Sequence, residues 1–270
     1  MKTLDYTNDT IKGLFDLTGK TAVITGGGGG LGLAVARGYA NFGANLVLTG
    51  RTQETLDKAA AELEDTGAKV LTVSADTLDP DDCQRIVDET VASFGKIDIL
   101  FPAAGVARRH AAEEFPKDNF DLVIDTNIKG TWYIDQAVGR QMIKQHAEGM
   151  SPAGKIINIT SVRANNGLDL GYGAYATSKG AVVSMTRQLA VEWAKYDICV
   201  NAVGPTIVMS ALTKPIFDDP EKAKVFTDRI LFHRPMIAGE LIGSMIYLAS
   251  PASDFITGQI LYVDGGCVAA

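Results

Sequence analysis

The chain has 270 residues, of which 46% are hydrophobic and 21% are charged, and its formal net charge is −7. This composition indicates a globular protein, and its acidic balance argues against nucleic acid as a partner. Three cysteines far apart and three histidines predict neither a disulfide framework nor a metal site. No segment has the length and apolarity of a signal peptide or a membrane span, so we expect a cytoplasmic protein with no membrane partner.

Apolar strands alternate with amphipathic helices along the chain. Strands are expected at 21–25, 45–49, 69–74, 97–101, 155–160, 198–203 and 259–263. Helices are expected at 31–42, 53–66, 80–94, 117–146, 175–195 and 238–249. Apolar strands separated by helices predict an α/β fold, a doubly wound parallel sheet of about seven strands with helices on both faces. The proline-containing segment 206–237 interrupts this alternation and is either a substrate lid or a loose surface excursion.

A run of glycines, Gly26 to Gly30 with Gly32 two residues on, joins the first strand to the first helix. Glycine loses more conformational freedom on folding than any other residue, so such a run needs a reason beyond stability. Between a strand and a helix, glycines let a pyrophosphate touch the backbone at the helix N-terminus. A flexible loop is the alternative. The strand–turn–helix context favours dinucleotide binding, and with it a single Rossmann-type domain over residues 1–270.

A second set of residues could carry proton transfer. Tyr175 and Lys179 are four residues apart at the start of a helix and therefore share one face, and Ser161 ends the preceding strand. A free phenol, with a pKa near 10, is a poor base at neutral pH, and a neighbouring ammonium lowers that value. A serine hydroxyl nearby could hold the oxygen of an alcohol or a ketone. A solvent-exposed pair on an amphipathic helix is the alternative for any lone Tyr-xxx-Lys.

Together these motifs resemble the short-chain dehydrogenase/reductase family, from about Leu17 to Gly266. The residues that carry the resemblance are Thr25-Gly26-xxx-Gly30-x-Gly32, Asp76, the Ala-Ala-Gly at 103–105, Asn127, Ser161, Tyr175-xxx-Lys179 and the Tyr-Val-Asp-Gly-Gly at 262–266. The resemblance implies that Tyr175 is the acid/base, that Ser161 holds the substrate oxygen and that Lys179 binds the nicotinamide ribose and lowers the pKa of Tyr175. It also implies that Asn127 holds a water that relays protons through Lys179.

The resemblance further implies an NAD(P) cofactor. The residues expected to contact it are Gly26, Gly28, Gly30, Leu31, Gly32, Arg51, Thr52, Asp76, Thr77, Ala103, Ala104, Gly105, Tyr175, Lys179, Pro205, Ile207 and Ser210. Two positions depart from the family's pattern. Pro102-Ala103 stands where the family has Asn-Asn, which predicts an altered turn rather than lost catalysis. Pro205-Thr206 stands where the family has Pro-Gly, and it resembles the dicarbonyl/L-xylulose reductase branch.

The end of the second strand bears on the choice between the two cofactors. An NAD site places Asp or Glu there to take the ribose 2′-OH, but this chain has Thr49-Gly50-Arg51-Thr52. Arg51 supplies a donor fork suited to a 2′-phosphate, so NADP is preferred and NAD remains possible. The alternative is that Arg51 faces solvent or stacks on adenine.

The candidate substrate residues are basic or aromatic. Arg108, Arg109 and His110 form a basic cluster in an acidic protein, Arg163 follows Ser161 closely, and Tyr172 precedes the catalytic tyrosine. The arginine pair resembles the sugar-acid branch of the family, such as gluconate 5-dehydrogenases and deoxygluconate dehydrogenases. A solvated surface pair is the alternative.

We therefore expect an NAD(P)-dependent enzyme that interconverts a secondary alcohol and a ketone on a sugar, polyol or sugar acid, with no metal. Two alternatives differ in kind. One is a reductase of apolar ketones, steroids or 3-oxoacyl thioesters, and the other is a non-catalytic dinucleotide-binding protein. The helices around 117–146 and Tyr175 resemble those that pair between subunits in the family, which implies a homotetramer, with a dimer as the fallback.

Overall fold

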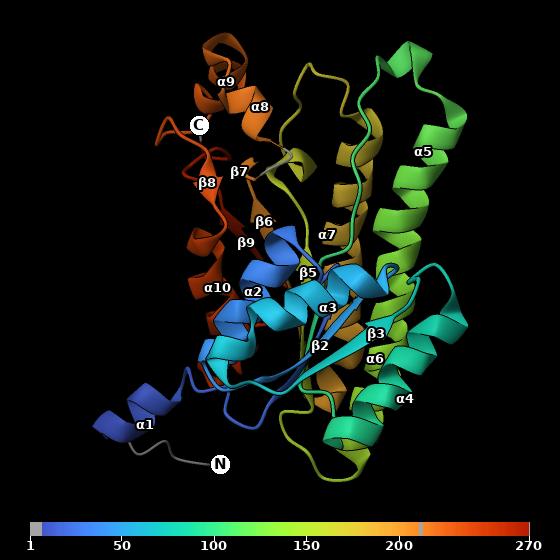
Figure 1. Ribbon diagram of the computed structural model, residues 1–270, viewed down its shortest axis with the longest axis vertical. Coiled ribbons are helices and arrows are strands. Elements are labelled where there is room, and N and C mark those ends of the chain that lie inside the picture. Colours follow the sequence, from blue (N-terminus) through green and yellow to red (C-terminus); the bar gives the residue numbers. More distant parts are fainter. Residues whose placement is uncertain (1–6, 211–212, 270) are drawn as a thin grey trace.

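The computed structural model describes residues 7–210 and 213–269 of the chain. A parallel sheet of seven strands, in the order β3-β2-β1-β4-β5-β6-β9, runs through the molecule (Figure 1). These strands are β1 (Thr21–Thr25), β2 (Asn45–Gly50), β3 (Val70–Ser74), β4 (Ile99–Pro102), β5 (Gly154–Ile159), β6 (Ile198–Pro205) and β9 (Ile260–Val263). All seven predicted strands are confirmed, with ends that move by at most two residues. The order turns back between β1 and β4, which is where a doubly wound sheet opens a crevice for a ligand.

Helices cover both faces of the sheet. They are α1 (Asn8–Gly13), α2 (Gly30–Asn41), α3 (Gln53–Glu62), α4 (Pro80–Phe94), α5 (Lys117–Ile124), α6 (Gly130–Ala147), α7 (Gly173–Trp193), α8 (Lys214–Phe217), α9 (Pro220–Thr227) and α10 (Gly239–Ala249). Buried side chains of α2, α3 and α10 belong to one hydrophobic cluster, and those of α4, α6 and α7 to another. The sheet therefore separates two cores.

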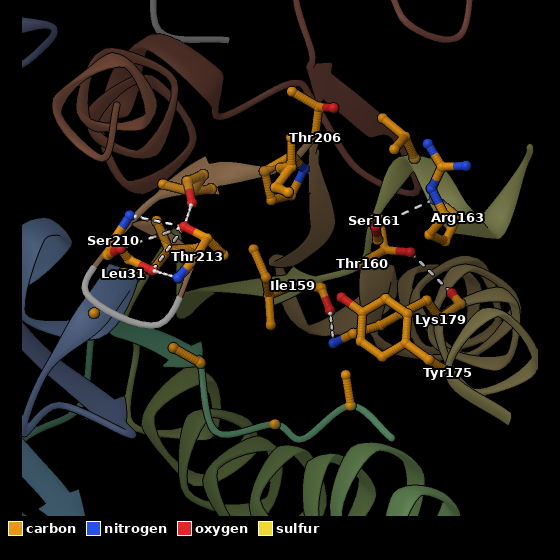
Figure 2. Close-up of a pocket in the computed structure, with 18 of the residues that line it drawn as sticks. Leu31, Ile159, Thr160, Ser161, Arg163, Tyr175, Lys179, Thr206, Ser210 and Thr213 are labelled. Atoms are coloured by element: carbon orange, nitrogen blue, oxygen red, sulfur yellow. Dashed lines mark hydrogen bonds between the residues drawn. The ribbon is translucent and has the colours of Figure 1, made fainter. Parts of the chain in front are cut away.

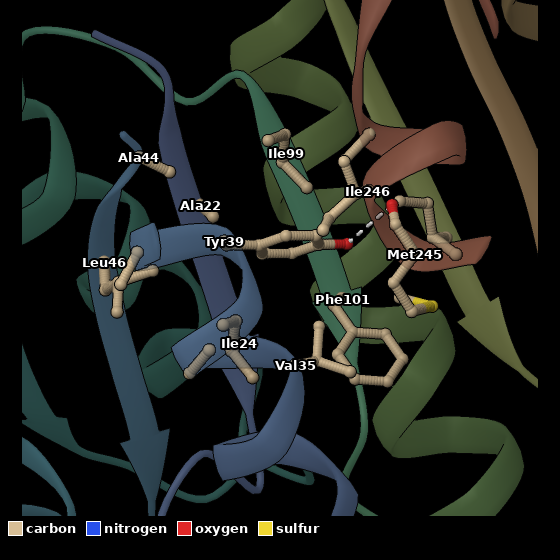
Figure 3. Packing of buried hydrophobic residues seen from close by; sticks show 14 of the residues in the cluster. Ala22, Ile24, Val35, Tyr39, Ala44, Leu46, Ile99, Phe101, Met245 and Ile246 are labelled. Carbon is tan, nitrogen blue, oxygen red and sulfur yellow. Dashed lines mark hydrogen bonds between the residues drawn. The ribbon is translucent and has the colours of Figure 1, made fainter. Parts of the chain in front are cut away.

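The strands feed both cores because neighbouring side chains point to opposite faces. Val23 and Leu100 lie in the cluster on the α4 side, whereas Ile24 and Phe101 lie in the cluster on the α2 side. Tyr39 of α2 is fully buried in the latter cluster, between Ile24, Phe101 and helix α10 (Figure 3). All five of these side chains are 0% exposed, so β1 and β4 are packed on both faces where they approach the cleft.

Three segments differ from expectation. The short helix α1 was not predicted. The expected helix 117–146 is interrupted by a π-helical turn at Asp125–Lys129, between α5 and α6. Segment 206–237, apart from residues 211–212, which lie outside the described residues, contains α8, α9 and two short parallel strands, β7 (Val208–Met209) and β8 (Met236–Ile237). In Figure 1, α8 and α9 lie together at the top of the molecule, beside the C-terminus.

Candidate active site

A cleft of about 790 Å³ lies where β1, β4, β5 and β6 end. Its volume falls within the range of small-molecule and cofactor sites. The walls come from the glycine turn, the loop after β4, the segment after β5, the start of α7 and both halves of segment 206–237. Segment 206–237 is therefore part of the site rather than a surface excursion.

The glycine turn leaves no room for side chains at two positions. A Cβ added at Gly32 would lie 2.3 Å from the carbonyl oxygen of Gly26. Gly26 itself has a φ of +64°, and a Cβ there would lie 3.0 Å from the backbone nitrogen of Ala104. This tight turn brings the loop after β4 against the N-terminus of α2, whose exposed N–H groups attract an anion. The geometry fits a dinucleotide's pyrophosphate.

The turn after β4, where Pro102-Ala103 departs from the family's pattern, is tied to β1 by backbone hydrogen bonds. Pro102 is the last residue of β4 and pairs with Thr25 of β1. The backbone N–H of Ala104 donates to the Thr25 hydroxyl at 3.1 Å, and that of Ala103 donates to the Thr25 carbonyl at 3.2 Å. Thr25 at the end of β1 therefore fixes this loop, which lacks the asparagines of the family's pattern.

Tyr175, Lys179 and Ser161 meet on one side of the cleft (Figure 2). Tyr175 lies in the first turn of α7, Lys179 one turn later, and Ser161 follows β5, as expected. The Lys179 ammonium lies 5.7 Å from the centre of the Tyr175 ring and donates to the carbonyl of Ile159 at 2.9 Å. The Thr160 hydroxyl donates to the Lys179 carbonyl at 2.8 Å, which ties α7 to the end of β5.

Asn127 lies in the π-helical turn, is fully buried and does not line the cleft. Its side-chain amide accepts from the N–H of Val106 at 2.8 Å and donates to the Val106 carbonyl at 2.9 Å, so it fixes the loop after β4. A Cβ added at Gly105 would lie 3.2 Å from the Asn127 side-chain oxygen and 3.8 Å from the Lys179 nitrogen. Asn127 and Lys179 therefore approach the same point of the loop.

The electrostatics of the site correct one expectation. Burial raises the pKa of Tyr175 in the protein alone, although the Ser161 hydroxyl and the charge of Arg163 act in the opposite direction. The Lys179 ammonium does not contribute to this shift. Burial instead lowers the pKa of Lys179 to about 8. The expected lowering of the tyrosine pKa by the ammonium is thus not found in the protein alone, where burial has the largest effect on Tyr175.

The expected cofactor residues divide into two groups. Those that line the cleft are Gly26, Gly30, Leu31, Gly32, Ala103, Ala104, Gly105, Tyr175, Lys179, Pro205, Ile207 and Ser210. Those that do not are Gly28, Arg51, Thr52, Asp76 and Thr77. Gly28 faces Thr55 of α3, and the Asp76 carboxylate accepts from the N–H of Leu78 at 3.0 Å within its own loop.

The substrate candidates divide as well. Arg163 and Tyr172 line the cleft, whereas Arg108 and Arg109 are exposed on the loop after β4 and do not. The Arg109 guanidinium lies 5.6 Å from the centre of the Tyr172 ring, so it reaches the edge of the site through that ring.

Several lining residues were not predicted from the sequence. They are Gly29, Val106, Ala107, Ile159, Thr160, Val162, Leu168, Thr206, Val208, Met209, Thr213, Phe226, Arg229 and Ala238. Most flank predicted residues and follow from the strand ends. Phe226 and Arg229 come from a distant segment without a motif, and no local pattern identifies them.

Two features are absent from residues 7–210 and 213–269. No cluster of three His, Cys, Asp or Glu side chains in these ranges could hold a metal ion. None of the helices in the same ranges combines the length and apolarity needed to cross a membrane.

Comparison with known proteins agrees with the motifs. Residues 26–268 match the family described as enoyl-(acyl carrier protein) reductase. The chain is 39% identical over 257 residues to 2-dehydro-3-deoxy-D-gluconate 5-dehydrogenase from Dickeya dadantii, covering 94% of this chain and 98% of the relative. It is 36% identical over 262 residues to gluconate 5-dehydrogenase from Gluconobacter oxydans, covering 94% and 96%.

A solved structure extends this similarity to the fold. A gluconate 5-dehydrogenase from Burkholderia cenocepacia, in complex with NADP and tartrate, matches with a TM-score of 0.89 and 35% identity, covering 96% of this chain and 98% of that chain. The sheet order, the glycine turn and the Ser161, Tyr175 and Lys179 arrangement all agree with one assignment. The chain belongs to the short-chain dehydrogenase/reductase family and is an NAD(P)-dependent oxidoreductase.

Proposed function

We propose that this enzyme interconverts a secondary alcohol and a ketone on a sugar acid, with NADP as the preferred cofactor. The observation that carries the proposal is Arg163, which lines the same wall of the cleft as Ser161 and Tyr175. A guanidinium there suits an anionic substrate. The names of the relatives, gluconate and deoxygluconate dehydrogenases, support the same substrate class.

We assign the acid/base role to Tyr175 and the orientation of the substrate oxygen to Ser161. A bound nicotinamide supplies or accepts the hydride. Because its pKa is raised, the Tyr175 hydroxyl keeps its proton at neutral pH and is ready to donate it to a ketone. Reduction is thus favoured at neutral pH, and alcohol oxidation should accelerate as the pH rises.

Lys179 and Asn127 serve proton exchange and positioning in this proposal. A pKa of about 8 lets the Lys179 ammonium release and recover a proton near neutrality. Asn127 holds Val106 by two hydrogen bonds and so fixes the loop that borders the nicotinamide end of the cleft. A water relay through Asn127 and Lys179 remains part of the proposal.

The preference for NADP rests on Arg51. Its side chain is exposed directly after β2, and within the described ranges no carboxylate lies within ion-pair distance of it. The guanidinium is therefore available to a 2′-phosphate. Solved relatives with bound NADP, among them a putative 2-deoxy-D-gluconate 3-dehydrogenase from Agrobacterium tumefaciens, support the choice.

A substrate screen with both cofactors tests the reaction. We expect faster oxidation of D-gluconate with NADP⁺ than with NAD⁺, and slower oxidation of D-glucitol and of cyclohexanol. Preference for cyclohexanol favours the alternative of an apolar-ketone reductase. Tight binding of NADPH without turnover of any substrate favours the alternative of a non-catalytic protein.

We propose a cytoplasmic homotetramer, with a dimer as the fallback. Trp132 of α6 is 39% exposed and Val191 of α7 is 76% exposed, so both helices present apolar side chains that a neighbouring subunit would cover. The three cysteines are free and buried, which suits a reducing compartment. Light scattering that shows a stable monomer contradicts the assembly, and cell fractionation tests the location.

A further inference from the structure

Two arginines from distant segments meet at the outer wall of the cleft. Arg163 lies in the 3₁₀ turn Val162–Ala164, two residues after Ser161, and Arg229 follows α9. Both line the cleft. One terminal nitrogen of each guanidinium donates to the same acceptor, the carbonyl oxygen of Gly167, at 3.4 Å from Arg163 and 3.3 Å from Arg229. Two positive groups thus converge on one neutral oxygen.

This pair has no anionic counterpart in the part of the chain that the structure describes. None of the ion pairs found there includes Arg163 or Arg229. Arg234, five residues beyond Arg229, shows the usual arrangement, since its guanidinium contacts the Glu240 carboxylate at 2.5 Å. A carbonyl carries only a partial charge, so it does not balance two guanidinium groups. An anion entering the cleft would.

The two arginines are held differently. Arg163 is half-buried, and its guanidinium also donates to the carbonyl of Asn166 at 3.3 Å and contacts the Cys267 sulfur at 3.8 Å. Its position is therefore fixed by the wall and by the C-terminal tail. Arg229 is exposed, and among the described residues its side chain has one hydrogen-bond acceptor, the carbonyl of Gly167. A guanidinium has five N–H donors, so most donors of Arg229 are available to a ligand.

We propose that Arg163 and Arg229 together bind the carboxylate of the substrate and make the enzyme selective for acids over neutral polyols. This inference rests on the proposed function. A carboxylate has two oxygens and accepts paired donors from a guanidinium fork, which a hydroxymethyl group cannot do. Anchoring that end of the chain leaves a carbinol further along it to reach Ser161 and Tyr175. Arg108 and Arg109 lie outside the cleft and take no part.

The test compares D-gluconate with D-glucitol, which differ at C1, where a carboxylate replaces a hydroxymethyl group. Oxidation of both is measured in the wild type, Arg163→Gln and Arg229→Gln, with 2-dehydro-3-deoxy-D-gluconate as a second acid. Lys224→Gln is the control, because it removes one positive charge from exposed α9 without touching the cleft. Melting temperatures show whether each variant is folded, and the exposed Arg229 gives the cleaner variant if Arg163→Gln unfolds.

We expect kcat/KM for the acids to fall by about tenfold or more in each variant, the size of one charge-assisted hydrogen bond, while that for glucitol changes less than about twofold. Lys224→Gln should match the wild type. If the wild type prefers acids and folded Arg229→Gln keeps that preference, the arginine pair is refuted while the proposed function stands. If the wild type itself prefers neither acid over glucitol, both the pair and the sugar-acid proposal are refuted.

Discussion

Replacement of Gly32 by alanine tests whether the glycine turn is set by backbone contact. The added Cβ would lie 2.3 Å from the carbonyl oxygen of Gly26 and 2.9 Å from its carbonyl carbon. Both are backbone atoms, so no side-chain rotation relieves the clash. To restore ordinary contact, α2 and the turn must separate by roughly 1 Å, and overpacking of this kind costs about 1–3 kcal/mol.

The displacement should appear in two measurements. For a chain of this size, 1–3 kcal/mol corresponds to a fall in melting temperature of about 2–5 °C. Separation of the turn from α2 also displaces the N–H groups that face the pyrophosphate, so the dissociation constant of NADPH should rise by about tenfold or more, the size of one hydrogen bond to a charged group. Thermal unfolding and a fluorescence titration with NADPH measure the two effects separately.

Gly29→Ala is the matched control for stability. Nothing lies within 4 Å of a Cβ at Gly29, and its φ of 173° is extended backbone that alanine adopts. The preference for glycine over alanine at a helix N-cap and the reduced freedom of the unfolded chain roughly offset each other. Its melting temperature should therefore stay near that of the wild type. If Gly32→Ala has the melting temperature and the NADPH dissociation constant of the wild type, contact with the Gly26 backbone is not the reason for a glycine at position 32.

Three further perturbations test other parts of the site and core. Tyr175→Phe should lower kcat by about 10²–10⁴-fold while NADPH binding is kept; near-normal turnover contradicts the acid/base role. Arg51→Ala should raise KM for NADPH by about tenfold and leave KM for NADH nearly unchanged. If KM rises equally for both cofactors, Arg51 does not discriminate NADP from NAD. Asp135 is fully buried, and burial raises its pKa to about 8 although the Asn158 side chain acts in the opposite direction. Between about pH 4 and 8 the folded protein holds a proton on Asp135 that the unfolded chain has lost. The free energy of unfolding of the wild type therefore falls by up to about 1.4 kcal/mol for each unit by which the pH rises. Asp135→Asn should flatten this dependence in urea unfolding at pH 5 and pH 8, and identical slopes contradict the assigned pKa.

The sheet and the catalytic trio were predictable from the sequence because both depend on local patterns. Buried parallel strands are short apolar runs, and the glycine turn, Ser161 and the Tyr175–Lys179 pair each follow a strand or open a helix. Residues at the ends of parallel strands meet at one edge of the sheet whatever the intervening loops do. The site therefore follows from the strand order.

What could not be predicted depends on distant contacts. Arg229 reaches the cleft through α9, and no periodicity in segment 206–237 shows which side chain turns inward. Arg109, part of a conspicuous basic cluster, instead stacks outside on Tyr172. The pKa of Tyr175 was also misjudged, because spacing reveals a neighbouring charge but not the extent of desolvation.

The π-helical turn at Asp125–Lys129 sets the phase between two helices. An α-helix advances about 100° per residue, and a π turn accommodates one residue more than an α turn. Removing one residue from this turn would let α5 run into α6 as a single regular helix. Asn127 would then swing away from Val106, or the outer face of α6, with Trp132, would rotate relative to α5. The length of this turn thus couples the position of the loop after β4 to the orientation of an exposed helical face.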